Sequence, residues 1–252
     1  MSHFRMLLCF MFLLPACSFA QSYFPGYAVK NNGDTLKGYI NYKRWEYNPK
    51  VIEFKPEADM QARKLSFNDI SYFSIDIGYP LDFKKYAGTI SMDDINVNNV
   101  TTLRDTSYKI DTVFLKILRK GKNITLFSYD DALKTRFFVA DGQSDPVELV
   151  YRLYLKNDEH DGNNTINEET YKKQLVALAE KYDKMSDALR VDINHANYAE
   201  MYLVPITNKI NGYTGKDVTK GNNLGTPPKT KLVLMSAIFL VVAYLMVSVM
   251  HK

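Results

Sequence analysis

The feature that most constrains this chain is an uncharged apolar stretch near its C-terminus, Leu232 to Met250. As a helix it would reach about 28 Å, close to the roughly 30 Å hydrocarbon core of a bilayer. Because lipid offers the backbone no hydrogen-bond partners, a single span must be helical. The sequence therefore predicts one transmembrane helix over residues 232–250, with the lipid bilayer as its partner. A buried helix of the folded body is the alternative, but such helices seldom exceed about 14 wholly apolar residues.

The N-terminus predicts export. An apolar segment follows a short basic start, and the small residues Ser18 and Ala20 then fit cleavage before Gln21. This is the pattern of a secretory signal peptide over residues 1–20. A rival cleavage before Cys17 resembles a lipoprotein site and would attach a lipid there. With either cleavage, export places the body outside the cytoplasm and the C-terminal helix holds it at the membrane.

Composition excludes several classes of function. Both cysteines, Cys9 and Cys17, precede the predicted cleavage before Gln21, so the mature body has no disulfide, no cysteine nucleophile and no cysteine-ligated zinc. The net charge is +4, but the excess lysines follow residue 213 and lie beside the predicted span. They would face anionic head groups there, or simply solvent. Since residues 21–212 are nearly neutral, the basic balance gives no argument for nucleic acid as a partner.

Residues 21–156 are predicted to form an antiparallel β-rich domain. Turn residues such as Asn31 to Asp34 and Gly121 separate short apolar and aromatic runs at intervals typical of a small sandwich or barrel. A long polar stretch, 93–107, is predicted to be a loop. The predicted strands cover residues 27–30, 36–42, 51–54, 64–67, 70–75, 83–92, 112–118, 124–129, 136–140 and 147–155.

Residues 157–212 are predicted to form a helical hairpin. Asn167 is the expected N-cap of the first helix, with Glu168 and Glu169 in its first turn. A second helix is expected over 192–203, and Pro205 is expected to kink or end it. Residues 213–231 are predicted to be a flexible linker. The fold class is thus mainly β with a C-terminal α part (α+β). The apolar face of the first helix comprises Tyr171, Leu175, Leu178, Ala179 and Tyr182.

Several motifs resemble a known group of proteins. Residues 23–29, 32–40 and 45–55 read YFPGYAV, NGDTLKGYI and WEYNPKVIEFK, and residues 114–129 contain FLKIL, GK and LFSY. These stretches resemble the N-terminal β-rich module of Bacteroidota cell-envelope proteins, over roughly residues 21–210. Many members of that group continue into an outer-membrane β-barrel, whereas this chain has a single apolar helix. The resemblance therefore implies a single-pass protein of the inner membrane with a periplasmic body, and outer-membrane residence is the lesser alternative. It implies no catalytic residue.

Candidate metal ligands are few. His160 and His195 are the only histidines in the predicted mature soluble part, and each is also compatible with a solvated position. The segment Asn157 to Glu168 has the spacing of a calcium loop, with Gly162 sixth and Glu168 twelfth. Its first position is Asn rather than Asp, and its eighth, Asn164, is polar rather than apolar. The alternative is a solvated connector, and no metal or cofactor is assigned.

Two acidic pairs, Asp93-Asp94 and Asp130-Asp131, are candidate acid/base groups. Adjacent residues on a strand point to opposite faces, so neither pair is expected to converge on one substrate atom. No catalytic residue is therefore assigned.

The sequence leaves two functions open. The first is a membrane-anchored extracytoplasmic structural or interaction protein of the bacterial envelope, without catalysis, which holds another envelope protein. The alternative is a glycan- or peptide-binding module that uses some of the 18 Tyr and 14 Phe, or Trp45, on a β-face. A binding module should have a concave aromatic patch, an interaction protein a flat apolar patch or open strand edge, and an enzyme converging carboxylates.

Overall fold

The computed structural model describes residues 22–99, 101–156 and 165–213. The predicted signal peptide, the predicted transmembrane helix and all but the first residue of the predicted linker lie outside these ranges. Within them, no helix has the length and apolar composition that crossing a bilayer requires.

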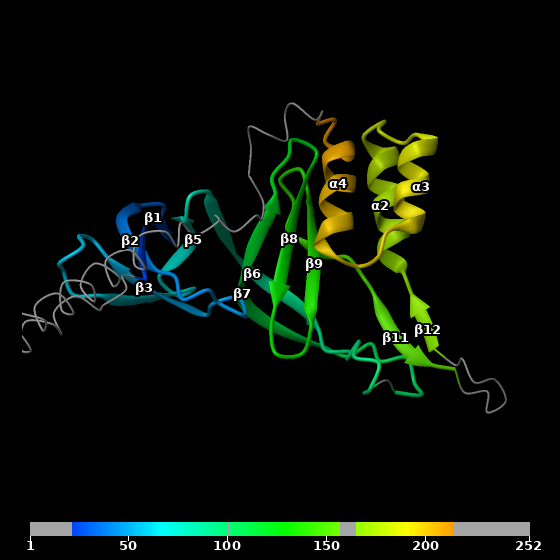
Figure 1. The fold of residues 1–252 in the computed structure, drawn as a ribbon, viewed down its shortest axis with the longest axis horizontal. Helices are drawn as coiled ribbons and strands as arrows, with labels where there is room; N and C mark the ends of the chain where they lie inside the picture. The colour runs from blue at the N-terminus through cyan, green and yellow to red at the C-terminus, as the bar shows by residue number, and fades with distance from the viewer. Residues whose placement is uncertain (1–21, 100, 157–164, 214–252) are drawn as a thin grey trace, which may run out of the picture.

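The described chain is mainly β, with helices at its C-terminal end, as the sequence predicts (Figure 1). The strands are β1 (Tyr23–Lys30), β2 (Thr35–Asn41), β3 (Val51–Lys55), β4 (Arg63–Ser66), β5 (Ile70–Asp76), β6 (Pro80–Ser91), β7 (Tyr108–Arg119), β8 (Ile124–Asp130), β9 (Thr135–Asp141), β10 (Val147–Glu148), β11 (Arg152–Leu155) and β12 (Thr165–Glu168). The helices are α2 (Thr170–Lys181), α3 (Asp187–His195) and α4 (Glu200–Ile210).

Ten strands form one antiparallel sheet in the order β10-β9-β8-β7-β6-β5-β1-β2-β3-β4. The antiparallel pairing is as expected, and the sheet curls into a half-barrel where the sequence predicted a small sandwich or barrel. The difference arises at β1, which pairs with β2 on one side and with β5 on the other. The sheet therefore ends at β10 on one side and at β4 on the other, and it keeps two separate edges.

The part of the sheet that contains β7, β8 and β9 is buried on both faces. In β8, Ile124 and Leu126 pack with the helices, while Phe127 and Tyr129 join a second cluster on the opposite face. Neighbouring strand residues point to opposite faces, so packing on both faces explains why β8 and β9 are almost continuously buried. A third cluster, centred on Phe73, holds the half that contains β1 to β5.

The two hairpins that the sequence marks most clearly are confirmed. Strands β1 and β2 pair around a turn in which Gly33 has φ +94°, a conformation that favours glycine. Strands β7 and β8 also pair, with a register shift between Ile117 and Arg119. The predicted loop at 93–107 contains no strand or helix in its described residues.

The predicted strand over 147–155 is wrong as a single element. Its first part is β10 at the edge of the large sheet, and Leu149 N donates to Phe137 O at 2.8 Å. Its last part, β11, pairs with β12 in a separate two-stranded sheet. The chain turns between them because Gln174 on α2 accepts from Val150 N at 2.9 Å and donates to Glu148 O at 2.9 Å.

The helical hairpin is replaced by three helices within the described residues. Asn167 and Glu168 belong to β12, so the predicted N-cap is wrong and Glu169 is the N-cap residue of α2. The predicted apolar face is confirmed, since Tyr171, Leu175 and Ala179 are buried. Helices α2, α3 and α4 stand together beside β8 and β9 (Figure 1).

The second predicted helix, 192–203, is wrong. Helix α3 ends at His195 and α4 begins at Glu200, and extended backbone at Ala196 and Ala199 separates them. The break is anchored by the Tyr171 hydroxyl, which donates to Ala196 O at 2.6 Å. Pro205 lies inside α4 instead of ending it. Pro205 and Met201, whose carbonyl the proline leaves without a donor, are both exposed, so water can satisfy that carbonyl.

Candidate functional site

A concave site lies where the β2–β3 loop meets the large sheet. Its volume is about 310 Å³, and we call it the Trp45 cavity. Four aromatic side chains and four charged side chains are among those that line it: Tyr42, Trp45, Tyr47, Tyr79, Glu46, Asp130, Glu200 and Lys116. They come from the β2–β3 loop, the β5–β6 turn, β7, β8 and the start of α4.

Trp45 is held rigidly in the wall of this cavity. Its ring makes edge-on contacts with Tyr42, Phe73 and Phe83, at centroid distances of 5.2, 6.1 and 5.8 Å. Such geometries are favourable for aromatic pairs. Just before it, Arg44 has φ 50°, a backbone conformation that residues with a Cβ rarely adopt. The loop therefore presents Trp45 in one orientation, half-buried.

Asn48 fastens the same loop between β7 and β8. Its Nδ2 donates to Phe114 O at 2.7 Å and to Ser128 O at 3.2 Å, and its Oδ1 accepts from Asp130 N at 3.1 Å. Its backbone N also donates to Asp130 O at 2.9 Å. Asn48 thus forms hydrogen bonds with main-chain groups of β7 and β8 where the two strands separate. The next residue, Pro49, is buried.

A second depression, of about 280 Å³, adjoins the Trp45 cavity. The two share Asp130 and Glu200, and Phe137, Thr135 and Tyr198 line the second. We call the combined site the Trp45 groove. Tyr198 is fixed at its far end, because its hydroxyl donates to Leu149 O at 2.7 Å and accepts from Phe137 N at 3.0 Å. Burial raises the pKa of Tyr198, so it stays a neutral phenol.

The groove carries more hydrogen-bond acceptors than cations. Asp130 accepts from the Thr135 hydroxyl, and no described residue pairs with the carboxylate of Glu200. The nearby carboxylate of Glu46 raises the pKa of Tyr47, which remains a hydrogen-bond donor at neutral pH. The arrangement can therefore accept hydrogen bonds from a ligand while it offers that ligand flat aromatic faces.

The two acidic pairs of the sequence analysis lie in different surroundings. Asp130 faces the groove, whereas Asp131 bonds to Arg136 at 3.0 Å. Burial raises the pKa of Asp131, but the hydrogen bond and charge of Arg136, together with backbone hydrogen bonds from Lys134 and Leu133, outweigh it, so the pKa lies below its usual value. Asp93 is buried beside Lys134, and Asp94 accepts from Asn96 N in an exposed loop.

The candidate metal ligands do not come together within the described part of the chain. His195 is exposed at the end of α3, and its Nδ1 lies 2.9 Å from Val191 O. His160 and residues 157–164 of the calcium-like segment lie outside the described ranges. Glu168, its twelfth position, accepts from Arg104 at 2.6 Å and from Arg152 at 3.2 Å. The described residues contain no group of three His, Cys, Asp or Glu placed to hold a metal ion.

No protein-family model, curated protein or solved structure matches this chain. The argument for a function therefore depends on the geometry of the chain itself. Trp45, as the one tryptophan in a turn-forming break, was the available sequence signal for the groove. Lys116, Tyr79 and Glu200 carried no such signal, because folding alone brings them to Trp45.

Proposed function

We propose that the protein is a non-catalytic binding module of the cell envelope that holds an extended glycan in the Trp45 groove. In this proposal the chain is exported, its body lies in the periplasm, and Leu232 to Met250 anchors it in the inner membrane. The observation that carries the proposal is the concentration of aromatic side chains and carboxylate acceptors in two adjoining depressions.

The chemistry of the groove suits sugar rings. The C–H bonds on one face of a pyranose carry a slight positive charge, and they pack on the negative face of an aromatic ring. The hydroxyl groups around the ring are donors for carboxylates such as those of Asp130 and Glu200. Small-molecule sites generally combine apolar walls with a few polar groups that fix orientation, and each end of this groove has that composition.

The Trp45 groove is less suited to an extended peptide than to a glycan. An extended peptide usually gains affinity by pairing its main chain with an open sheet edge. Where β7 and β8 separate, Asn48 already bonds to Phe114 O, Ser128 O and Asp130 N. At one edge of the sheet, β4 is only four residues long and exposes Arg63 and Lys64, and short charged edge strands resist pairing. Glycan binding needs none of these main-chain groups.

Co-sedimentation of the full chain with insoluble glycans tests the proposal. Peptidoglycan sacculi, chitin and cellulose serve as probes, and we expect the chain to sediment with at least one. Tyr47→Ala should then weaken binding by about tenfold, since stacking on one aromatic ring contributes on the order of 1–2 kcal/mol. Tyr47 is 46% exposed, so its replacement should leave the fold intact.

The matched control is Tyr27→Ala, which removes another tyrosine of similar exposure, 37%, on β1 outside the groove. Its binding should equal that of the wild type. The proposal fails if none of the three glycans retains the chain, or if the Tyr47 and Tyr27 variants bind alike.

A second candidate function, contact with another envelope protein, is favoured by a different surface. Near the start of β7, Tyr108 and Ile110 are 65% and 81% exposed, and Val147 on β10 is 59% exposed. Exposed apolar groups of this kind often mark interaction sites when they gather. A photo-crosslinking residue at Ile110, used in intact cells, should capture a defined protein that the same residue at Tyr27 does not. Identical products from the two positions would remove this candidate.

A further inference from the structure

The first half of β7 has an edge that no other strand of the described chain covers. Strand β7 pairs with β6 from Tyr108 to Lys116, but it pairs with β8 only from Lys116 onward. Asn48 lies where β8 leaves β7, and its side chain donates to Phe114 O. Residues 108–113 therefore have a neighbouring strand on one side only, and we call this stretch the open β7 edge.

The bonds around the open β7 edge show which main-chain groups face its uncovered side. In an antiparallel strand, the N–H and C=O of one residue point to the same side, and those of the next residue point to the other side. Ser107 O points toward β6, because it accepts from the residue that follows β6, at 2.9 Å. Phe114 O points away from β6, because the β2–β3 loop donates to it at 2.7 Å. The residues whose N–H and C=O face the uncovered side are thus Tyr108, Ile110 and Thr112.

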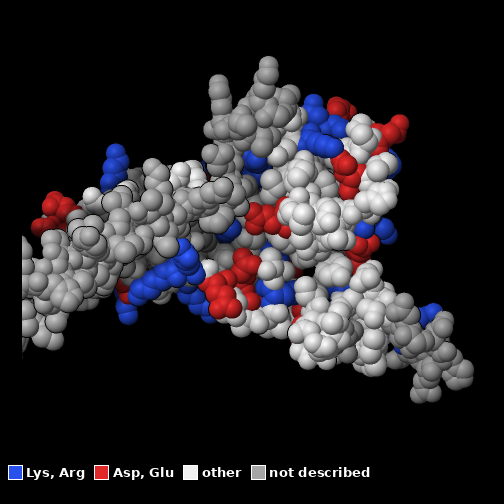
Figure 2. Space-filling model, viewed as in Figure 1, with Lys and Arg blue, Asp and Glu red and all other residues white. Residues whose placement is uncertain are grey.

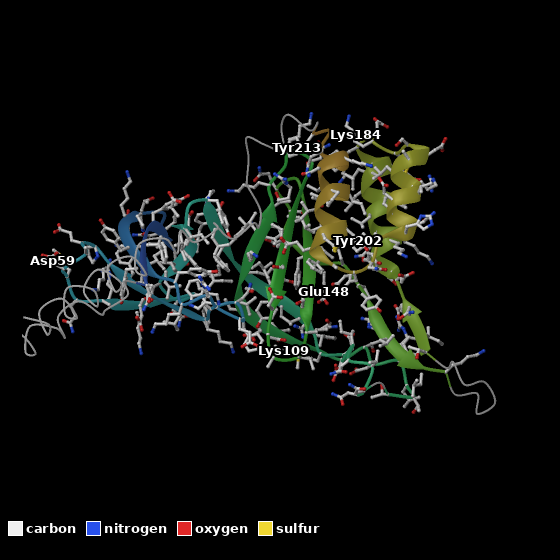
Figure 3. The ribbon with its side chains drawn as sticks, viewed as in Figure 1. Asp59, Lys109, Glu148, Lys184, Tyr202 and Tyr213 are labelled. Carbon is white, nitrogen blue, oxygen red and sulfur yellow. The ribbon has the colours of Figure 1, made fainter. Side chains whose placement is uncertain are left out.

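The side chains of the open β7 edge are accessible. Ile110 is 81% exposed, more than any other large apolar residue of the described chain, and Tyr108 on the same face is 65% exposed. On the other face, Lys109 Nζ lies 3.1 Å from Asp111 Oδ2. Figure 3 shows Lys109 at the lower end of the sheet, and a depression of about 370 Å³ separates it from the β8–β9 turn. Open edges with exposed apolar side chains are places where a further strand can pair.

The order of residues makes this edge complementary to itself. A two-fold axis requires one surface that matches its own copy. If two such edges pair antiparallel with the axis at Ile110, then each Lys109 lies opposite Asp111 of the second copy. In the same register Ile110 meets Ile110, and Tyr108 meets Thr112. Opposite charges and apolar groups placed directly across an antiparallel pair stabilise it, whereas like charges destabilise it.

We propose that two copies of the chain pair through the open β7 edge and form an antiparallel dimer with Ile110 on its two-fold axis. The N–H and C=O of Ile110 exchange hydrogen bonds with those of Ile110 in the second copy. Thr112 N now donates to Asp111 Oδ1 at 2.8 Å, and it becomes available to Tyr108 O of the second copy when Asp111 turns toward the opposite Lys109. The dimer goes beyond glycan binding, because none of these residues lines the Trp45 groove.

The contact is short, and this sets how the dimer should behave. Stable interfaces bury at least about 1,200 Å² in total, and a pairing over residues 108–112 is smaller than that. Association should therefore be weak and should depend on concentration.

Disulfide crosslinking of the purified full chain tests the register. Opposite residues of a hydrogen-bonded pair lie about 5.5 Å apart, within the Cα range of a disulfide, so Ile110→Cys should give a covalent dimer on oxidation. Lys109→Cys alone and Asp111→Cys alone should give several-fold less, because identical positions would lie about 8 Å apart. An equal mixture of these two variants should crosslink, since their cysteines meet at about 4.5 Å. The wild-type chain controls for crosslinks through Cys9 and Cys17.

Sedimentation equilibrium with charge-reversed variants tests the complementarity. Lys109→Glu and Asp111→Lys each place like charges opposite one another twice, so each should weaken dimerisation at least about tenfold. Mixed in equal amounts they should associate again, because the introduced Glu meets the introduced Lys. Both side chains are partly exposed, 37% and 29%, so the fold should survive. The matched control is Lys30→Glu, which disrupts the exposed pair with Asp34 and should leave dimerisation unchanged.

Several results would overturn the dimer. They are a wild-type chain that stays monomeric up to millimolar concentration, an Ile110→Cys variant that crosslinks no better than Tyr27→Cys, and a charge-reversed mixture that associates no better than either variant alone. Photo-crosslinking from Ile110 that captures a different protein and no second copy would also overturn it. Glycan binding is measured separately through Tyr47→Ala, so either proposal can fail without the other.

Discussion

Replacement of Asn211 should be among the most damaging single changes in the described chain. Asn211 is the C-cap residue of α4, and it is 2% exposed. Its Oδ1 accepts from Asn123 N at 2.9 Å and from Ile124 N at 3.0 Å. Its Nδ2 donates to Ile124 O and to Thr207 O, both at 3.0 Å. One side chain thus joins the last helix to the tip of the β7–β8 hairpin.

The expected loss in the free energy of unfolding follows from the groups that Asn211→Ala would leave without a hydrogen-bond partner. Asn123 O accepts from Gly142 N on the β9 side, so the next residue, Ile124, directs its polar groups away from β9. Ile124 is fully buried, and Asn211 bonds to both its N–H and its C=O. At about 2 kcal/mol for each buried orphaned group, the loss is about 4 kcal/mol. This is a large part of the roughly 5–15 kcal/mol that keeps a domain folded.

Urea unfolding followed by circular dichroism measures this loss in the full chain. The control is Asn31→Ala, because the Asn31 side chain also bonds to two carbonyls, at 3.3 and 2.6 Å, but in an exposed turn. There water replaces the lost bonds, and the cost should stay within about 1 kcal/mol. The reasoning is refuted if Asn211→Ala costs less than about 1.5 kcal/mol at an unchanged denaturant slope.

Three further outcomes follow from other contacts. Gly121→Ala should also lower the free energy of unfolding in urea, because a Cβ there would lie 2.0 Å from Asn211 Nδ2. In an Asn211→Ala background the same substitution should lower that free energy far less. If the two losses simply add, the clash between the Cβ and Asn211 is not the cause. Asn48→Ala should lower stability by about 2 kcal/mol in the same assay and weaken glycan binding; unchanged unfolding would show that the loop is not held there. The third outcome concerns pH. The hydrogen bond from Arg104 lowers the pKa of Glu168 in the folded protein. The ion pair therefore stabilises the fold fully at pH values above the pKa of an unfolded Glu, about 4.3, and this stabilisation is lost as the pH falls through the lower pKa of folded Glu168. Arg104→Ala should therefore destabilise the protein at pH 7 but not in strong acid, and an equal loss at both would count against the ion pair.

Charge on the surface is mixed, in keeping with the near-neutral composition of the body. Figure 2 shows Lys and Arg as well as Asp and Glu side chains on the visible face of the described residues. The Trp45 groove accordingly depends on local arrangement rather than on a long-range field. The groove joins aromatic rings to the carboxylates of Asp130 and Glu200.

Local residue patterns were sufficient to predict most strands and turns from the sequence. Gly33 and Gly121 mark the turns of the β1–β2 and β7–β8 hairpins, and alternation or continuous apolar character marks the strands themselves. The apolar face that begins at Tyr171 likewise predicts α2. Such signals are readable because turn chemistry and side-chain period act between residues that are close along the chain.

Tertiary contacts decided the remainder. The pairing of β1 with β5, the split at 149–151 and the break between α3 and α4 depend on partners far along the chain, such as Gln174 and Tyr171. The lining of the Trp45 groove could not be predicted from the sequence either, because Lys116, Asp130 and Glu200 come close to Trp45 only when the sheet curls and α4 packs. The sequence by itself thus determined the local elements and the mainly β class. Only the folded chain determined strand order, helix breaks and the Trp45 groove, because these depend on long-range packing, for which a linear pattern carries no direct signal.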